Sequence, residues 1–327
     1  MTITEIAAAC GVAPSTASRA LSNPNRVSAE MYERISRKAT EMGYASAMLP
    51  VTPKGRARGT IALVLPNLTN PYNLDLIRGS HAQARAADYL HVLVSSDESV
   101  HAEGVWLREL ARTVDGIVIS SPRCDDAVLQ AAADTVPIVV VNRDVPGLSG
   151  VVVDTAAGMA QALDYLVSLG HRSIAYVRGP VGSWTDRARF AALTEAAERH
   201  GVELIAVGAY LPTLSAGAAA SDAVVLTGAT SAIFFNDTLA VGALARFRQL
   251  GVDVPEQLSV VGCDDIFGAS FSNPPLTTVT SPGERAGHDA TDLLMSRFSS
   301  RDRSRRLDRL AAHLSVREST GPAPGSR

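Results

Sequence analysis

The spacing of apolar residues predicts three short helices in residues 1–44. The first opens with the capping-box pattern TITE and ends at Gly11, a residue suited to a helix C-terminus. Residues 14–21 form the second, and the third begins at Ser28, a good N-cap, and ends before Gly43. The apolar face of the first helix consists of Ile3, Ile6, Ala7 and Cys10. This head is therefore all-α, with a helix, a glycine turn and a second helix.

From Thr60 the pattern changes to short β-branched runs, each followed by a longer amphipathic or alanine-rich stretch. The runs are TIALVLPN, LHVLVSSD, GIVISSP, PIVVVNRD, SIAYVRGP, ELIAVGAY, AIFFND and LSVVGCDD. Apolar strands that alternate with helices predict parallel sheets with helices on both faces. Because the pattern restarts after Gly170, the eight strands form two groups of four. Residues 60–320 are therefore expected to be an α/β body with two similar lobes.

Two segments have the composition of connecting or terminal chain. Residues 45–59, ASAMLPVTPKGRARG, contain two prolines, two glycines and three basic residues, which is typical of a linker. The last seven residues, 321–327, read GPAPGSR and are predicted to be disordered.

The length of 327 residues allows two or three domains, and 46% hydrophobic with 19% charged residues is typical of a globular protein. No apolar run reaches membrane-spanning length and no signal-peptide pattern opens the chain, so we expect a cytoplasmic protein that does not enter a membrane. The three cysteines, Cys10, Cys124 and Cys263, are far apart and lack the spacing of metal ligands. We expect them to be reduced and structural, and we expect no metal and no cofactor.

The net charge of −3 is unevenly distributed. Residues 1–58 hold eight Lys and Arg against four acidic residues, a net charge of +4, and the rest of the chain carries −7. A basic head on an acidic body indicates that only the head meets a polyanion.

The second helix of the head has side chains that are small or hydroxylated, apart from Arg19 and Leu21. Short polar side chains let a helix lie close to base edges in the DNA major groove, and Arg19 could make a bidentate contact with guanine. The alternative is a small helix that only packs the domain. We assign to the DNA interface Pro14, Ser15, Thr16, Ser18, Arg19, Asn23 and Ser28.

These motifs resemble a known family. Residues 1–44 are similar to the DNA-binding head of the lac repressor–galactose repressor family of bacterial regulators, including the Ser-x-Arg-Ala-Leu of the recognition helix. In the body, LVLPNLTNPY, LGHRSIAYVRGP, FFNDTLAVGAL, LSVVGCDD and NPPLTTV follow the same family in order and spacing. The resemblance implies a helix-turn-helix head and a body like periplasmic sugar-binding proteins, with two lobes joined by three crossovers. It also implies a homodimer on pseudo-palindromic operator DNA and a small effector, possibly a sugar, bound between the lobes.

Polar residues stand at the predicted strand ends, where ligands bind in open α/β sheets. By motif, the resemblance implies that Tyr72 stacks on the effector and that polar residues bind its hydroxyl groups. The effector-binding residues implied in this way are Tyr72, Asn73, Arg143, Arg189, Asn236 and Asp264.

Each of these assignments has an alternative. Asp264 or Asp265 could cap a turn, Tyr72 could be a core residue, and Arg187 could take the place of Arg189. Asn73 stands where the family often has a second aromatic residue, and Ser281 stands where relatives often have a larger amide. The effector therefore need not be a common hexose.

The linker departs from the family pattern of a short hinge helix with a leucine that wedges into the minor groove. Pro50 falls inside that helix and Pro53 stands at the leucine position, so we expect an extended strap rather than a helix. The alternative is a one-turn helix in which Leu49 becomes the wedge.

Two other functions compete with a ligand-controlled DNA-binding repressor. An enzyme on a nucleotide-binding fold is disfavoured, because the sequence has no G-x-G-x-x-G, P-loop, G-x-S-x-G or H-E-x-x-H motif. A sugar-binding protein without a role in gene control would not need the basic head.

Overall fold

The computed structural model describes residues 3–22, 27–42, 58–299 and 304–325. It divides into two compact units, residues 1–58 and residues 59–327. The predicted hinge positions Leu49, Pro50 and Pro53 lie outside the described residues. The two units are described separately below.

The described residues of the head form three helices, α1 (Ile3–Cys10), α2 (Pro14–Ser22) and α3 (Ala29–Glu41). Gly11 ends α1 in the left-handed conformation (φ 62°), and the N–H of Val12 donates to the carbonyl of Ala7. The helices enclose a small core of Ile6, Ala20, Ile35 and Ala39. The predicted helix, turn and helix are therefore present.

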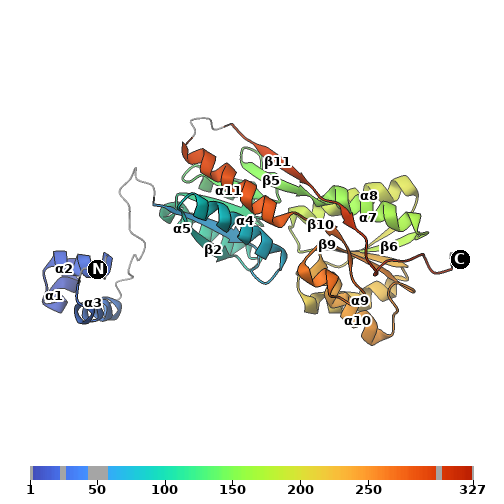
Figure 1. Ribbon diagram of the computed structural model, residues 1–327, viewed down its shortest axis with the longest axis horizontal. Helices are drawn as coiled ribbons and strands as arrows, with labels where there is room; N and C mark the ends of the chain where they lie inside the picture. The colour runs from blue at the N-terminus through green and yellow to red at the C-terminus, as the bar shows by residue number, and fades with distance from the viewer. Residues whose placement is uncertain (1–2, 23–26, 43–57, 300–303, 326–327) are drawn as a thin grey trace. The chain divides into compact units, whose positions relative to one another are not determined.

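The body contains two six-stranded sheets, which define an N-terminal and a C-terminal lobe (Figure 1). The first sheet has the order β11-β5-β4-β3-β1-β2 and the second β12-β10-β9-β8-β6-β7. All neighbouring strands are parallel except the β10–β12 pair. The prediction of two similar lobes with parallel sheets is confirmed.

The strands of the N-terminal lobe are β1 (Thr60–Leu65), β2 (Leu90–Ser95), β3 (Gly116–Ser120), β4 (Ile138–Val141), β5 (Ser149–Asp154) and β11 (Leu307–Ala311). Its helices are α4 (Tyr72–Ala86), α5 (Val100–Thr113), α6 (Asp126–Ala133) and α11 (Gly283–Ser299). The strands of the C-terminal lobe are β6 (Ser173–Val177), β7 (Glu203–Val207), β8 (Ser231–Phe234), β9 (Ser259–Asp264), β10 (Thr277–Thr280) and β12 (Leu314–Ser315). Its helices are α7 (Thr155–Ser168), α8 (Trp184–His200), α9 (Leu214–Thr227), α10 (Asp237–Leu250) and the short 3-10 helix η2 (Phe267–Ser270).

The chain passes between the lobes three times, from β5 to α7, from β10 to α11 and from β11 to β12. The implied three crossovers are therefore present. Helices cover both faces of each sheet, and Figure 1 shows α11 lying along α4 on the N-terminal lobe. The carboxyl ends of the strands of each sheet are thereby left for a site between the lobes.

Glycines permit the closest helix pairs. A Cβ added at Gly79 of α4 would lie 1.8 Å from the backbone oxygen of Glu284 in α11. In the C-terminal lobe, a Cβ at Gly217 of α9 would lie 2.1 Å from the backbone oxygen of Leu239 in α10. Backbones this close exclude any side chain at these positions, which explains glycine inside a helix.

Two predictions about the body need correction. Four strands were missed, β5, β10, β11 and β12, so each sheet has six strands instead of four. The tail was predicted to be disordered, but Gly321 and Ala323 are bound to the C-terminal lobe, and Ala323 is buried. The N–H of Ala323 donates to the carbonyl of Leu169, and the N–H of Gly321 donates to the hydroxyl of Ser259. Backbone hydrogen bonds hold this glycine- and proline-rich segment, which its composition does not reveal.

Candidate functional sites in the head and between the lobes

Among the side chains of the second head helix that the structure describes, two alanines are buried. Ala17 and Ala20 are fully buried, whereas Pro14 and Ser15 are exposed and Thr16 and Ser18 are half-buried. Among the described side chains of α2, the core thus contacts the two alanines, and the others are proline and short polar residues. Arg19 belongs to α2, but its side chain lies outside the described part of the structure, as does all of Asn23.

The helices α2 and α3 begin differently. The hydroxyl of Ser28 accepts a hydrogen bond from the N–H of Met31 at 3.3 Å, so Ser28 is the N-cap predicted for α3. Ala13 precedes α2 and has no side-chain oxygen to do the same, although its carbonyl accepts from the N–H of Thr16. A missing cap of this kind costs about 1 kcal/mol of helix stability.

The candidate ligand site is a cavity of about 40 Å³ between the lobes of the body. This volume holds about three water molecules, so the lobes must separate to admit a sugar ring. Residues from the ends of strands in both sheets line the cavity: Pro66, Asn70, Tyr72, Asn73, Glu98, Ser121, Arg123, Asn142, Thr155, Ser183, Thr185, Arg189, Pro212, Phe235, Asp264 and Ser281. Of the six predicted effector-binding residues, four line it: Tyr72, Asn73, Arg189 and Asp264.

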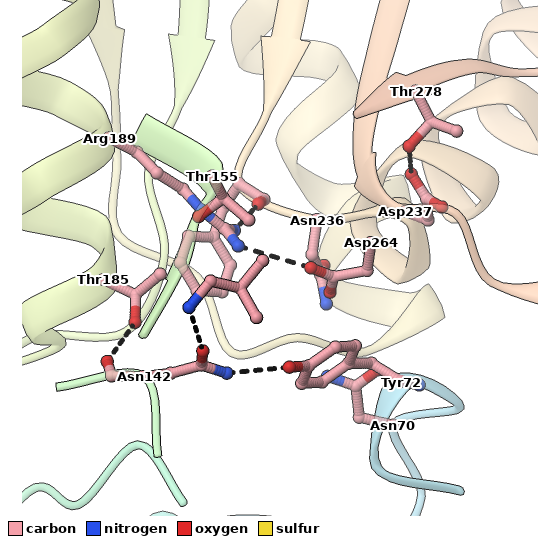
Figure 2. Close-up of polar contacts among 12 residues, drawn as sticks. Asn70, Tyr72, Asn142, Thr155, Thr185, Arg189, Asn236, Asp237, Asp264 and Thr278 are labelled. Atoms are coloured by element: carbon pink, nitrogen blue, oxygen red, sulfur yellow. Dashed lines mark hydrogen bonds and ion pairs between the residues drawn. The ribbon is translucent and has the colours of Figure 1, made fainter. Parts of the chain in front are cut away.

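Arg189 is the most firmly held side chain of the cavity (Figure 2). It projects from α8 and donates to the hydroxyl of Thr155 at 3.0 Å, to the carbonyl of Phe235 and to the carboxylate of Asp264 at 3.3 Å. Its guanidinium carbon also lies 4.8 Å from the centre of the Phe235 ring. The side chain is 5% exposed, and although burial lowers the pKa of Arg189, the neighbouring Cys263 and Asp264 raise it above its usual value. Arg189 therefore presents a fixed positive charge to the cavity.

Asp264 ends β9 with a backbone φ of 110°, a conformation that residues other than glycine rarely adopt. Burial raises the pKa of its carboxyl, while Arg189 opposes the shift. The next residue, Asp265, has its carboxylate 2.6 Å from the guanidinium of Arg317 and holds the C-terminal segment. The sequence left open which of the two aspartates faces the ligand and which has a structural role. Asp264 faces the cavity, and Asp265 does not line it.

Behind Asp264 lies a second buried carboxyl, that of Asp237, which sequence reasoning did not single out. It accepts from the hydroxyl of Thr278 at 2.5 Å and from the N–H of Ile266 at 2.9 Å. A Cβ at Gly262 would lie 2.1 Å from its oxygen, so only glycine fits there. Burial first, and then the charge of Asp264, raises the pKa of Asp237 to about 7.

Asn236 is fully buried beside this pair and is the N-cap of α10, its Oδ1 accepting from the N–H of Leu239 at 3.1 Å. Among the described residues, none accepts a hydrogen bond from its Nδ2. A buried amide donor without a partner is costly and usually has a reason. Asn236 does not line the closed cavity. Its Nδ2 group, which has no partner among the described residues, lies next to Asp264 and is compatible with the predicted role in effector binding (Figure 2).

Tyr72 and Asn142 connect the N-terminal lobe to the site. The Nδ2 of Asn142 donates to the hydroxyl of Tyr72 at 2.9 Å, and the carbonyl of Asn142 accepts from the hydroxyl of Thr185, on α8 of the other lobe, at 3.2 Å (Figure 2). Burial raises the pKa of Tyr72 to about 12, so this phenol stays neutral. Tyr72 is buried and also lines the cavity. It is therefore compatible with both alternatives that the sequence suggested, a core residue and a residue that stacks on the effector.

Two predicted residues are used for structure. The amide of Asn73 donates to the carbonyl of Asn67 at 2.5 Å and fixes the loop after β1. Arg143 does not line the cavity, and its side chain is bound to the neighbouring loop instead. Its guanidinium donates to the carbonyls of Pro122 and Cys124, at 3.0 and 2.7 Å, and pairs with Asp126 at 2.5 Å. Its position after β4 suggested the site, but the turn directs the side chain to the neighbouring loop.

Sequence reasoning missed the other charged residues of the cavity, Glu98 and Arg123. They follow β2 and β3, so the rule that ligands bind beyond strand ends would have found them. Among the described residues, seven other than glycine have positive φ, and four of them line the cavity: Glu98, Ser121, Asn142 and Asp264. Strained backbone of this kind gathers at functional sites.

The comparisons with known proteins agree with this architecture. Residues 2–46 match the family model for bacterial regulatory proteins of the lacI family, and residues 163–320 match a periplasmic binding protein-like domain. The regulator DegA of Bacillus subtilis is 29% identical over 98% of this chain and 98% of its own length. The repressor CytR of Escherichia coli is 28% identical over 99% of this chain and 97% of its own.

A solved structure of the transcriptional regulator CelR in complex with cellobiose has a TM-score of 0.73 and 28% identity. That alignment covers 98% of this chain and 99% of CelR. Head, body and relatives thus agree over nearly the full length. The chain belongs to the lacI family of bacterial regulatory proteins, a family of DNA-binding transcriptional regulators.

Proposed function

We propose that this lacI-family regulator is a repressor that binds operator DNA as a homodimer and responds to a small polar metabolite between its lobes. The observation that carries the proposal is Arg189, held by three acceptors against Asp264 in a cavity that both lobes line. A fixed guanidinium beside a carboxylate offers donors and acceptors together, which suits hydroxyl groups of a sugar or a related compound.

Residues 1–44 provide the DNA contacts in this proposal. Residues 1–58 have a net charge of +4, and α2 exposes Pro14 and Ser15 while Ala17 and Ala20 are buried. Arg19 is proposed to specify a base, with Ser15, Thr16, Ser18, Asn23 and Ser28 at phosphates or bases. One head covers few base pairs, so two copies on a pseudo-palindrome are needed for operator affinity.

The effector contacts are proposed to come mainly from the C-terminal lobe. Asp264 accepts from hydroxyl groups, Arg189 and the unpaired amide of Asn236 donate to them, and Tyr72 covers an apolar face of the ligand. The relatives support a ligand of this class, since CelR binds cellobiose. Ligand binding would stabilise the closed lobes and thereby change operator affinity.

We propose no catalytic activity, because the full-length relatives are regulators. The described residues contain no cluster of three or more potential metal ligands. None of the helices in the described part of the chain is long and apolar enough to span a bilayer. We propose that the protein acts in the cytoplasm, where bacterial chromosomal DNA lies.

Deletion of residues 1–58 tests whether the head binds DNA and the body binds the effector. Full-length protein should shift a DNA fragment from its own promoter region in a gel, and the truncated protein should not. Thermal-shift screening against sugars should give the same hits for both proteins. Retained operator binding by the truncated protein would refute the role of the head.

Asp264→Asn tests the effector site. It keeps the size of the side chain and removes the charge, so affinity for a sugar found in the screen should fall about 10- to 100-fold. Unchanged affinity in a folded variant would remove Asp264 from the site.

A further inference from the structure

The cavity contains a second charged pair, on the N-terminal lobe. The Nε of Arg123 donates to Oε2 of Glu98 at 2.7 Å, and the side chains are only 6% and 10% exposed. We propose that Glu98 and Arg123 form a second ligand anchor, which makes the protein specific for a neutral compound with adjacent hydroxyl groups and against its phosphate ester. This inference rests on the proposed function of the cavity and names the class of its ligand.

The pair is held rigidly. The Nη1 of Arg123 donates to the carbonyl of Ser121 at 3.1 Å, and the N–H of Glu98 donates to the carbonyl of Pro66 at 2.8 Å. The N–H groups of Arg123 and Cys124 both donate to the buried carboxylate of Glu103, at 2.7 and 2.8 Å. The two loops that carry the anchor are therefore fixed before a ligand arrives, as a specific site requires.

Part of the bonding capacity of the pair is unused. The described residues provide no hydrogen-bond partner for Nη2 of Arg123 or for Oε1 of Glu98, although both residues line the cavity. A free donor next to a free acceptor matches two hydroxyl groups on neighbouring carbons. One hydroxyl would donate to Glu98 and the other would accept from Arg123.

Stability alone does not explain the pair. A buried ion pair is often no better for stability than apolar residues of similar volume, because both charges lose water. Glu98 and Ser121 also have positive φ, 61° and 46°, which adds backbone strain at both loops. A charged pair held on strained loops and facing a cavity is better explained by ligand binding.

The charges of the cavity determine which ligand fits. Its charged residues are Glu98 and Asp264 against Arg123 and Arg189, so their sum is zero. Each guanidinium already contacts one of these carboxylates. A phosphate ester would bring a charge of about −1.5 to −2 against two carboxylates with no unpaired cation to balance it. A neutral polyol with hydroxyl groups at both ends can use both pairs.

The first experiment is a binding panel on the full-length protein. Calorimetry and thermal shift would compare ribose, xylose, glucose, galactose, cellobiose and adenosine with ribose 5-phosphate, glucose 6-phosphate and adenosine monophosphate. We expect at least one neutral compound to bind and its phosphate ester to bind at least tenfold more weakly. A panel in which only phosphate esters bind, or in which no neutral compound binds, overturns the inference.

The second experiment uses Glu98→Gln, which is nearly isosteric and leaves Arg123 as an unpaired cation. Affinity for the neutral binder should fall about tenfold or more, and affinity for its phosphate ester should rise. A gain of binding cannot come from a misfolded protein, so this readout separates an anchor from a purely structural ion pair. Glu109→Gln, an exposed change of the same charge on α5, is the matched control and should change neither affinity.

Deoxy analogues of the neutral binder complete the test. Removal of one of the two hydroxyl groups bound by the pair should weaken binding to the native protein about tenfold and to Glu98→Gln much less. If Glu98→Gln behaves like Glu109→Gln while Asp264→Asn loses binding, the second anchor is wrong and the proposed function stands. If Asp264→Asn also leaves binding unchanged, the proposed ligand site itself is wrong.

Discussion

The two lobes share a topology but support their charged residues differently. In the C-terminal lobe, Arg189 projects from the helix α8 and is bound by a hydroxyl, a carbonyl and a carboxylate. In the N-terminal lobe, Arg123 lies in the loop after β3 and donates a hydrogen bond to Glu98 in the loop after β2. Side chains on regular elements are placed more precisely than those on loops. Both charged pairs are held in place, but the C-terminal lobe holds its arginine on a helix, whereas in the N-terminal lobe a change of loop residues can alter specificity.

The largest effect is expected from Arg189→Met. Loss of the guanidinium leaves the carboxylate of Asp264 buried without its cation, which should cost about 3–5 kcal/mol of unfolding free energy. Urea unfolding of the full-length protein, followed by the fluorescence of Trp106 and Trp184, measures this. Ligand affinity should be lost in the same variant.

The control for Arg189→Met is Arg187→Met on the same helix. The side chain of Arg187 is exposed and donates to the carbonyl of Gly182, so its loss should change stability by less than about 0.5 kcal/mol. Equal effects of the two changes would show that Arg187, the alternative that the sequence left open, shares the role.

Asp237 gives the C-terminal lobe a pH dependence. Its pKa is raised from 3.8 to about 7 on folding, so the folded state favours the neutral form. The contribution of this group to stability is full below about pH 4 and is lost as pH rises through 7, up to about 4 kcal/mol. Asp237→Asn should therefore flatten the fall in stability between pH 4 and pH 8. An identical pH profile in the variant would mean that Asp237 is ionised throughout.

Arg143→Met separates structure from ligand binding in the N-terminal lobe. The change removes two hydrogen bonds to carbonyl groups and the pair with Asp126, and should cost about 1–3 kcal/mol of stability. Ligand affinity should change less than about twofold, because Arg143 does not line the cavity. A tenfold loss of affinity without loss of stability would restore Arg143 as an effector ligand.

In both lobes, the sequence predicted the central strands of the sheet better than the remaining strands. The eight predicted strands are apolar runs, most of them in sheet centres, and burial on both faces makes such runs easy to recognise. Of the missed strands, β10 (TTVT) and the polar edge strand β11 (LDRLA) lack that signal, whereas β5 (SGVVVD) is apolar and buried and was overlooked. Hydrogen bonds to neighbouring strands, which composition does not encode, decide whether such segments join a sheet.

Strand-end rules located the site but not the direction of its side chains. Asn142 and Arg143 are consecutive residues after β4, yet only Asn142 reaches the cavity, because its positive φ of 59° turns the chain. Arg123 and Glu98 become partners through loops 25 residues apart, and no local pattern shows that pairing. No sequence pattern singles out Asp237, whose pKa is raised because the fold buries it beside Asp264. Packing between distant segments therefore decides which polar residues form the site.

The smallest effect is expected from the contact between the lobes themselves. The hydroxyl of Thr185, on α8, donates to the carbonyl of Asn142 at 3.2 Å and joins the C-terminal lobe to the N-terminal one. Thr185→Val keeps the shape of the side chain and removes this bond, which should cost about 0.5–1.5 kcal/mol of the closed arrangement. Because the ligand must then close a more open protein, its affinity should fall about two- to tenfold, mainly through faster dissociation. Thr194→Val on the same helix is the control, since the hydroxyl of Thr194 donates only within α8, to the carbonyl of Phe190. Stopped-flow measurement of ligand dissociation distinguishes the two variants, and an equal rate in both would show that the lobes close without help from Thr185.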